Sequence, residues 1–125
     1  MNRRSSLRLL IAAIILAPAL LAASCRSYHI DISIENRSGA PIQLLEVDYP
    51  SASFGADSLA AGTTFHYRIE VIDSGPLKIT YTEPNGKQAQ ITGPDLAEHQ
   101  QGRLEIVLLP GGHAEFHPQI TPAAQ

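Results

Sequence analysis

The chain has 125 residues, of which 44% are apolar and 17% are charged, with one Cys and no Trp. This length suits one small globular domain and excludes a multidomain enzyme, and the composition excludes a coiled coil or a collagen-like rod. Apolar residues concentrate in residues 7–23, whereas all 12 acidic residues lie at or beyond Asp31. The first 24 residues are therefore a different kind of segment from the rest.

Residues 1–24 begin with a cationic stretch, continue with an apolar centre over residues 9–21 and end in small residues. This order is typical of a bacterial secretory signal peptide. The uninterrupted apolar run, residues 9–23, is shorter than the roughly 20 residues that a permanent membrane-spanning helix needs, and Pro18 would kink it. We therefore expect a signal peptide, and a retained membrane anchor is the alternative.

Residues 21–25, Leu-Ala-Ala-Ser-Cys, resemble the lipobox of bacterial lipoproteins. The resemblance covers the first 25 residues and implies that a dedicated signal peptidase cuts between Ser24 and Cys25 once the Cys25 thiol carries diacylglycerol. Each buried CH₂ of the acyl chains contributes about 0.8 kcal/mol, so two or three chains would attach the protein permanently to a membrane. Ordinary secretory cleavage after Ser24 is the alternative, and it would leave a soluble exported domain.

The single cysteine favours the lipoprotein interpretation, because a lone free thiol would be oxidised in an exported domain whereas a thioether is inert. Arg26 and Ser27, which follow Cys25, lack the Asp that usually retains such proteins in the inner membrane. The resemblance therefore implies a protein of the bacterial cell envelope, anchored in the outer membrane and facing the periplasm or the cell surface. Residues 25–27 would form a short tether.

The charge of the exported part argues against nucleic-acid binding. Three of the nine Lys and Arg residues lie in residues 1–24, so residues 25–125 carry six against 12 acidic residues. These six are scattered among acids, whereas binding to phosphates needs clustered cations. The same acidity disfavours binding of the domain itself to anionic headgroups, so we expect membrane contact only through Cys25.

Strand-like alternation of apolar and polar residues runs through residues 28–118. It predicts seven strands, at residues 28–35, 42–49, 64–71, 77–81, 87–92, 104–108 and 114–116. A change of phase between Leu44 and Leu45 predicts a β-bulge, and Glu83-Pro84-Asn85-Gly86 predicts a hairpin turn.

Two segments are expected to lie outside the strands. Residues 51–62 are rich in Ser, Ala and Gly and predict a loop, and residues 119–125 predict a flexible tail. Short strands, Gly and Pro turns and no helical stretch together predict an all-β fold, a small antiparallel β-sandwich of immunoglobulin or fibronectin-III type over residues 28–118. A partly open barrel is the alternative.

No group of residues predicts a catalytic site, a cofactor or a metal centre. His113, Glu115 and His117 alternate on an expected strand, which would hold the two imidazoles about 13 Å apart, too far for one ion. Residues 55–59, Gly-Ala-Asp-Ser-Leu, resemble the GDSL block of esterases only superficially, because the inserted Ala breaks the motif.

A catalytic triad of Asp57, Ser58 and His66 would rest on composition alone, because a triad is defined by its geometry. We therefore expect no enzyme. Most aromatic residues fall on the apolar phase of a strand, but Tyr49 and Phe54 flank Pro50 beside the expected loop. These two are the expected exposed surface for a partner or ligand.

The expected function is that of a membrane-anchored lipoprotein that presents its sandwich to an envelope protein, for binding or assembly. The alternative is an exported module that binds a glycan or a peptide through residues 49–59. Architecture alone does not decide between them, since sandwiches serve many functions.

Overall fold

The computed structural model describes residues 28–122, which form eight β-strands and no helix. The strands are β1 (Ile30–Asn36), β2 (Ile42–Tyr49), β3 (Ala52–Leu59), β4 (Thr64–Ile69), β5 (Gly75–Thr82), β6 (Gln88–Leu96), β7 (Gln101–Leu109) and β8 (His113–Thr121). The predicted all-β class is confirmed. Across this described range, no helix has the length and apolar character needed to cross a membrane.

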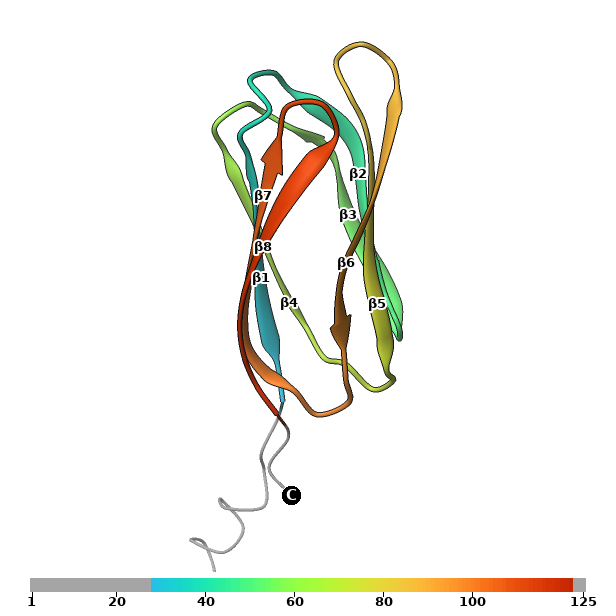
Figure 1. Cartoon of the computed structure of the whole chain (residues 1–125), viewed down its shortest axis with the longest axis vertical. Helices are drawn as coiled ribbons and strands as arrows, with labels where there is room; N and C mark the ends of the chain where they lie inside the picture. Colours follow the sequence, from blue (N-terminus) through green and yellow to red (C-terminus); the bar gives the residue numbers. More distant parts are fainter. Residues whose placement is uncertain (1–27, 123–125) are drawn as a thin grey trace, which may run out of the picture.

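The strands form two layers (Figure 1). Sheet A has the order β4-β1-β7-β8 and sheet B the order β3-β2-β5-β6. Neighbouring strands are antiparallel, except that β1 and β7 run parallel, with Ile30 beside Gly102 and Asn36 beside Leu108. Because the two sheets are separate, the β-sandwich is confirmed over the partly open barrel.

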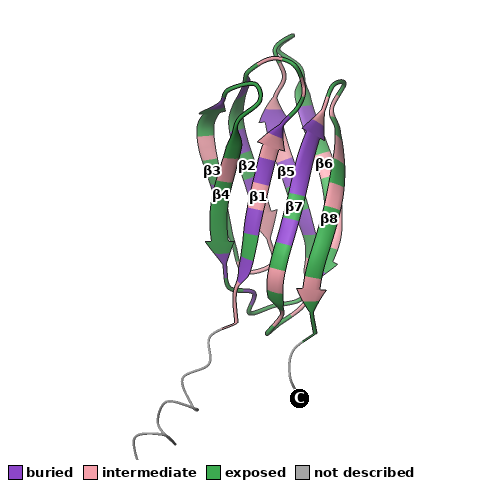
Figure 2. Cartoon of the chain, turned by 90° about the vertical axis from the view of Figure 1, so that its left-hand side faces the viewer, coloured by how far each residue is buried: buried purple, intermediate pink, exposed green. Residues whose placement is uncertain are grey.

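The core lies between the two sheets. Because successive side chains of a strand point to opposite faces of its sheet, every second side chain points into this core. Figure 2 shows buried residues alternating with exposed or intermediate ones along the central strand β1, and a run of buried residues toward the end of the other central strand, β7. On β1, Ile30, Ile32 and Ile34 are buried, as the sequence predicts. Sheet B contributes buried apolar side chains from all of its strands, among them Ile42, Val47, Phe54, Leu77, Ile79, Tyr81 and Leu96.

The expected loop at residues 51–62 is wrong, because residues 52–59 form the strand β3. It pairs with β2 from Tyr49 beside Ala52 to Ile42 beside Leu59. β3 is an edge strand of sheet B, and its backbone forms hydrogen bonds with the backbone of β2. These hydrogen bonds hold β3 in the sheet although its small and polar side chains have a low strand propensity. The sandwich therefore has eight strands instead of the expected seven.

The predicted β-bulge in β2 is confirmed, between Gln43 and Glu46. Its backbone turns at Leu44, whose φ of 52° is unusual for a branched residue. Leu44 is 66% exposed and Leu45 is buried, so the phase changes one residue earlier than expected. Opposite the bulge, a Cβ at Gly55 would collide with the carbonyl oxygen of Leu45, so only glycine suits this position.

The sandwich has two ends, which we call the tether end, after the expected tether at residues 25–27, and the distal end. At the tether end, β1 begins and β8 finishes, in the lower part of Figure 1. At the distal end lie the turns at residues 37–41, 60–63, 83–87 and 110–112. The predicted hairpin is among them, and its Glu83 N–H donates to the carbonyl of Lys87 at 2.8 Å.

The expected tail is wrong for residues 119–121, which belong to β8 and pair with residues 101–103 of β7. The folded domain thus extends beyond residue 118. The predicted signal peptide at residues 1–24, cleavage between Ser24 and Cys25, and lipidation of Cys25 lie outside the described residues.

Candidate functional site

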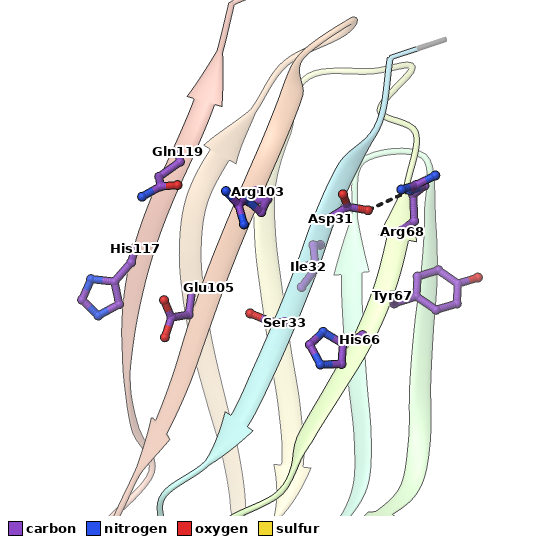
Figure 3. A pocket seen from close by; sticks show the side chains of 10 residues that line it. All are labelled: Asp31, Ile32, Ser33, His66, Tyr67, Arg68, Arg103, Glu105, His117 and Gln119. Atoms are coloured by element: carbon purple, nitrogen blue, oxygen red, sulfur yellow. Dashed lines mark hydrogen bonds and ion pairs between the residues drawn. The ribbon is translucent and has the colours of Figure 1, made fainter.

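The outer face of sheet A carries a hollow of about 760 Å³, which we call the sheet A hollow (Figure 3). All four strands of the sheet contribute to it. Its lining residues are Asp31, Ile32, Ser33, His66, Tyr67, Arg68, Arg103, Glu105, His117 and Gln119.

Strand register arranges the polar side chains of this hollow in two rows that cross the sheet from β4 to β8. One row consists of Arg68, Asp31, Arg103 and Gln119, and the next of His66, Ser33, Glu105 and His117. All of these residues occupy the outward phase of their strands. Ser33 is the smallest of them and lies on the central strand β1, between the longer side chains of His66 and Glu105. This difference in length makes the face concave.

An ion pair organises one side of the hollow, where the Nε of Arg68 donates a 2.7 Å hydrogen bond to Oδ1 of Asp31. This hydrogen bond is the largest cause that lowers the pKa of Asp31, and the positive charges of Arg68, His29 and Arg103 lower the pKa further. The same hydrogen bond raises the pKa of Arg68. Asp31 therefore stays ionised and holds the Arg68 guanidinium across β1 and β4.

β7, the next strand of sheet A, contributes two more charged side chains to the hollow, Arg103 and Glu105. Between Tyr28 and Pro122, neither Arg103 nor Glu105 forms an ion pair with another side chain. The hollow thus presents a free cation, a free anion and the imidazoles of His66 and His117 on one concave surface (Figure 3). This mixture suits binding of a polar surface with charges of both signs.

The order of groups in the second row does not suit nucleophilic catalysis. A Ser-His-acid triad needs the imidazole between the hydroxyl and the carboxylate. Here Ser33 lies in the middle, with His66 on one neighbouring strand and Glu105 on the other. The carboxylate is therefore on the wrong side to orient the imidazole, and the row does not have the order of a catalytic triad.

The structure does not bring together Asp57, Ser58 and His66, the three residues whose types match a catalytic triad. Asp57 and Ser58 lie on β3 of sheet B, whereas His66 lies on the outer face of sheet A. On β8, Nε2 of His117 lies 3.4 Å from Oε2 of Glu115. Among the residues that the structure describes, no three His, Cys, Asp or Glu side chains form a group that could hold a metal ion.

Tyr49 and Phe54 do come together, but not as an exposed pair. Phe54 is only 7% exposed, which makes its expected exposure wrong, and Tyr49 is half-buried. The Phe54 ring stacks on Tyr67, with ring centroids 4.3 Å apart and planes at 9°. Phe65 completes this aromatic cluster. The cluster joins β3 to β4, edge strands of opposite sheets that meet at one side of the sandwich (Figure 2).

Two features of this surface were missed by reasoning from the sequence. Tyr67 occupies the apolar phase of β4 but is 45% exposed, because β4 is an edge strand. Arg68 and Arg103 are far apart in the sequence, yet the pairing of β1 with both β4 and β7 puts them on either side of Asp31. The sequence indicated only that Arg68 and Arg103 point outward from their strands, and not that they become neighbours.

The comparisons with known proteins support the fold alone. No protein-family model matches the chain, and no curated protein matches it. The chain is similar to a protein from Eubacterium rectale whose structure was determined by NMR, with a TM-score of 0.52 and 12% sequence identity. The match covers 73% of this chain and 88% of that protein. It agrees with the two-layered β architecture and carries no statement about function.

Proposed function

We propose that this protein is a lipid-anchored component of the bacterial cell envelope that binds another envelope protein and is not an enzyme. Two features support the proposal. The first is the resemblance of residues 21–25 to a lipobox. The second, which carries the binding role, is the sheet A hollow, where Arg103 and Glu105 form no ion pair with any residue between Tyr28 and Pro122.

The distance between Cys25 and the sandwich supports a function close to a membrane. β1 begins at Ile30, five residues beyond Cys25. Because an extended chain spans at most about 3.6 Å per residue, a lipid on Cys25 would hold the tether end within about 20 Å of the membrane surface. The sheet A hollow would then meet mainly proteins of the same membrane.

The chemistry of the hollow favours a protein partner. Two guanidinium groups, two carboxylates and two imidazoles can pair with a surface that also carries both signs of charge. A nucleic acid would need a predominance of cations, which the exported part of the chain lacks. The alternative, a glycan or peptide site through residues 49–59, has less support because Phe54 is buried in the aromatic cluster.

The lipid anchor is tested by the intact mass of the protein purified in detergent from membranes of a bacterium that processes lipoproteins. The expected mass is that of residues 25–125 plus two or three acyl chains. The Cys25→Ser variant should lose both the lipid and the membrane association. A wild-type protein without lipid would overturn the anchor while leaving the binding role open to its own test.

The binding role is tested by placing a photoreactive amino acid at Ser33, in the centre of the hollow, in cells that produce the protein naturally. The matched position is Thr80, which is also half-buried on a central strand but lies on the outer face of sheet B. We expect a discrete cross-linked protein from position 33 and none from position 80. Equal cross-linking from both positions would contradict the proposal.

Charge reversal then tests whether the hollow itself recognises the partner. The double variant Arg68→Glu with Arg103→Glu should abolish the cross-link from position 33. The matched double variant Lys78→Glu with Lys87→Glu changes the net charge equally but lies in β5 and the following hairpin, so it should retain the cross-link. Retention in the first variant would exclude a charge-based contact at the hollow.

A further inference from the structure

A second cavity, which we call the distal cavity, lies at the distal end of the sandwich and is separate from the sheet A hollow. It has a volume of about 220 Å³ and lies between the β1–β2 turn, the β5–β6 hairpin and the β7–β8 turn. Its lining residues are Ser38, Ile42, Tyr81, Glu83, Pro84, Asn85, Pro110 and Gly111. These turns gather at the end of the sandwich opposite the start of β1 and the end of β8 (Figure 1).

The phenol of Tyr81 is the unusual group in this lining. Tyr81 is a core residue of β5 and only 1% exposed. Its hydroxyl is the one buried side-chain polar atom, among residues 28–122, that has no hydrogen-bond partner. Buried hydroxyl groups are nearly always paired, because losing water without a replacement bond is costly. A ligand in the distal cavity would supply the missing partner.

Of the other polar side chains of the cavity, Ser38 and Glu83 offer acceptors, whereas Asn85 offers its Nδ2 donors, because its Oδ1 already accepts from the Lys87 N–H at 2.9 Å. The Ser38 hydroxyl donates its own hydrogen within the β1–β2 turn, to Oδ1 of Asn36 at 2.6 Å or to the carbonyl of Ala40 at 3.0 Å. Its oxygen keeps free lone pairs. Glu83 makes no side-chain hydrogen bond or ion pair within the described part of the chain.

The electrostatic character of the cavity is negative. Glu83 carries the only formal charge among the lining residues. Its carboxylate lies close enough to the Tyr81 phenol to raise the pKa of that group, although burial is the larger cause. The apolar part of the cavity wall consists mainly of Ile42, Pro84 and Pro110. The complementary ligand therefore carries a positive charge, several N–H donors and a short apolar stem.

We propose that the distal cavity binds a primary alkylammonium group, whose N–H bonds are accepted by the Glu83 carboxylate and the Tyr81 hydroxyl. The methylene stem then packs against the two prolines and Ile42. Such a group is found on a lysine side chain of another protein and on small free amines. This site does not depend on the lipid anchor or on the sheet A hollow, so either proposal can fail alone.

The test uses the full-length chain in detergent, with NMR titration by n-butylammonium. We expect saturable shifts of the Tyr81 ring signals and of the Gly111 and Gly112 amides, with a dissociation constant in the millimolar range. n-Butanol, which has the same stem without the charge, should shift these signals much less at equal concentration. Equal shifts from the two compounds, or shifts that do not saturate, would overturn the proposal.

Two variants and one control assign the contacts. Glu83→Gln keeps the backbone bond from Glu83 N–H to the Lys87 carbonyl and should weaken binding about tenfold, as expected for a lost charged hydrogen bond. Tyr81→Phe removes only the hydroxyl and should weaken binding about threefold. Glu98→Gln, at the tether end, should leave binding unchanged. Unchanged binding in Glu83→Gln, with a folded spectrum, would exclude the site.

A second titration distinguishes the two sources of the ammonium group. Nα-acetyl-lysine methylamide presents the lysine side chain as a protein does, and ethanolamine represents a small free amine. Binding of the lysine derivative at the Tyr81 ring, weakened by Glu83→Gln, would identify a lysine-bearing partner. Binding of ethanolamine alone would identify a small amine, and binding of neither compound nor n-butylammonium would overturn the proposal.

Discussion

Asn36 of sheet A donates a 2.9 Å hydrogen bond from its side-chain Nδ2 to the carbonyl oxygen of Leu59 in sheet B. The same Nδ2 donates to Ala40 at 2.9 Å, and Oδ1 accepts hydrogen bonds from the backbone and hydroxyl of Ser38. Asn36 is completely buried, and apart from Tyr81 with its phenol it is the only buried residue with a polar side chain in the described range. One fully hydrogen-bonded amide thus connects the two layers at the distal end.

The variant Asn36→Ala should lower the free energy of unfolding by about 2 to 4 kcal/mol, because it removes the buried bond to the Leu59 carbonyl and the part-buried bonds to Ser38 and Ala40. Chemical denaturation followed by circular dichroism measures this change. The control is Asn85→Ala, whose side chain makes one exposed hydrogen bond, to the Lys87 N–H. The control should change the same free energy by less than about 1 kcal/mol, and equal effects would contradict the role of Asn36.

The aromatic cluster predicts unequal effects of two truncations. Phe54→Ala should lower the free energy of unfolding by about 3 to 4 kcal/mol, because it opens a cavity beneath Tyr49, Phe65 and Tyr67. Tyr67→Ala should cost only about 1 to 2 kcal/mol, because almost half of Tyr67 is exposed. A larger loss for Tyr67→Ala in the same denaturation experiment would show that the cluster is not centred on Phe54.

The bulge at Leu44 predicts a stabilising substitution. Leu44 has a φ of 52°, in the left-handed region, and its side chain is 66% exposed. Asn tolerates this region better than Leu, so Leu44→Asn should raise the free energy of unfolding by about 0.5 to 1 kcal/mol. The neighbouring Gln43→Asn gains nothing of this kind and should not stabilise. A lower melting temperature for Leu44→Asn would mean that Leu44 makes contacts worth more than its backbone strain.

The Arg68–Asp31 pair predicts a pH dependence of stability. The folded pKa of Asp31 is lowered, so its contribution is present above the ordinary aspartate pKa and is lost as the pH falls through the folded value. Asp31→Asn should therefore flatten the decline of unfolding free energy at acid pH. Asp73→Asn, which removes a carboxylate from the β4–β5 loop without breaking an ion pair, is the control. Equal slopes for wild type and Asp31→Asn would contradict the prediction.

An NMR titration can check the same pair directly. In Arg68→Gln the pKa of the Asp31 carboxyl group should rise toward its ordinary value, because the largest cause of its lowering is removed. An unchanged pKa would assign the lowering to Arg103 and His29 instead.

Local alternation was sufficient for strands in which apolar and polar residues alternate regularly, such as β1. The pattern around Ile30, Ile32 and Ile34 predicts both β1 and its buried side, since the side-chain direction has a period of two in any strand. The hairpin at Glu83–Gly86 and the bulge after Gln43 were predictable for the same reason, because turn residues and a change of phase are local signals.

The strand β3 and the end of β8 were not predictable in this way. β3 has small and polar residues around Phe54, and it is a strand because β2 offers its backbone as a partner. Ile120 and Thr121 belong to β8 because Gly102 and Gln101 pair with them. In both places the hydrogen bonds come from backbone groups of another strand, which leave no periodic signal in the side chains.

For the candidate site too, the sequence indicated the direction of single side chains, and the tertiary structure decided which of them are neighbours. The sequence by itself indicated that Asp31, Ser33, His66 and Arg68 point away from the core, and its residues 21–25 resemble the lipobox on which the proposed anchor depends. Only the tertiary structure decided that Arg103 and Glu105 lie beside them, through the parallel pairing of β1 with β7. Pairing between strands distant in the chain is selected by the packing of the whole core, so no short stretch of sequence encodes which charges become neighbours.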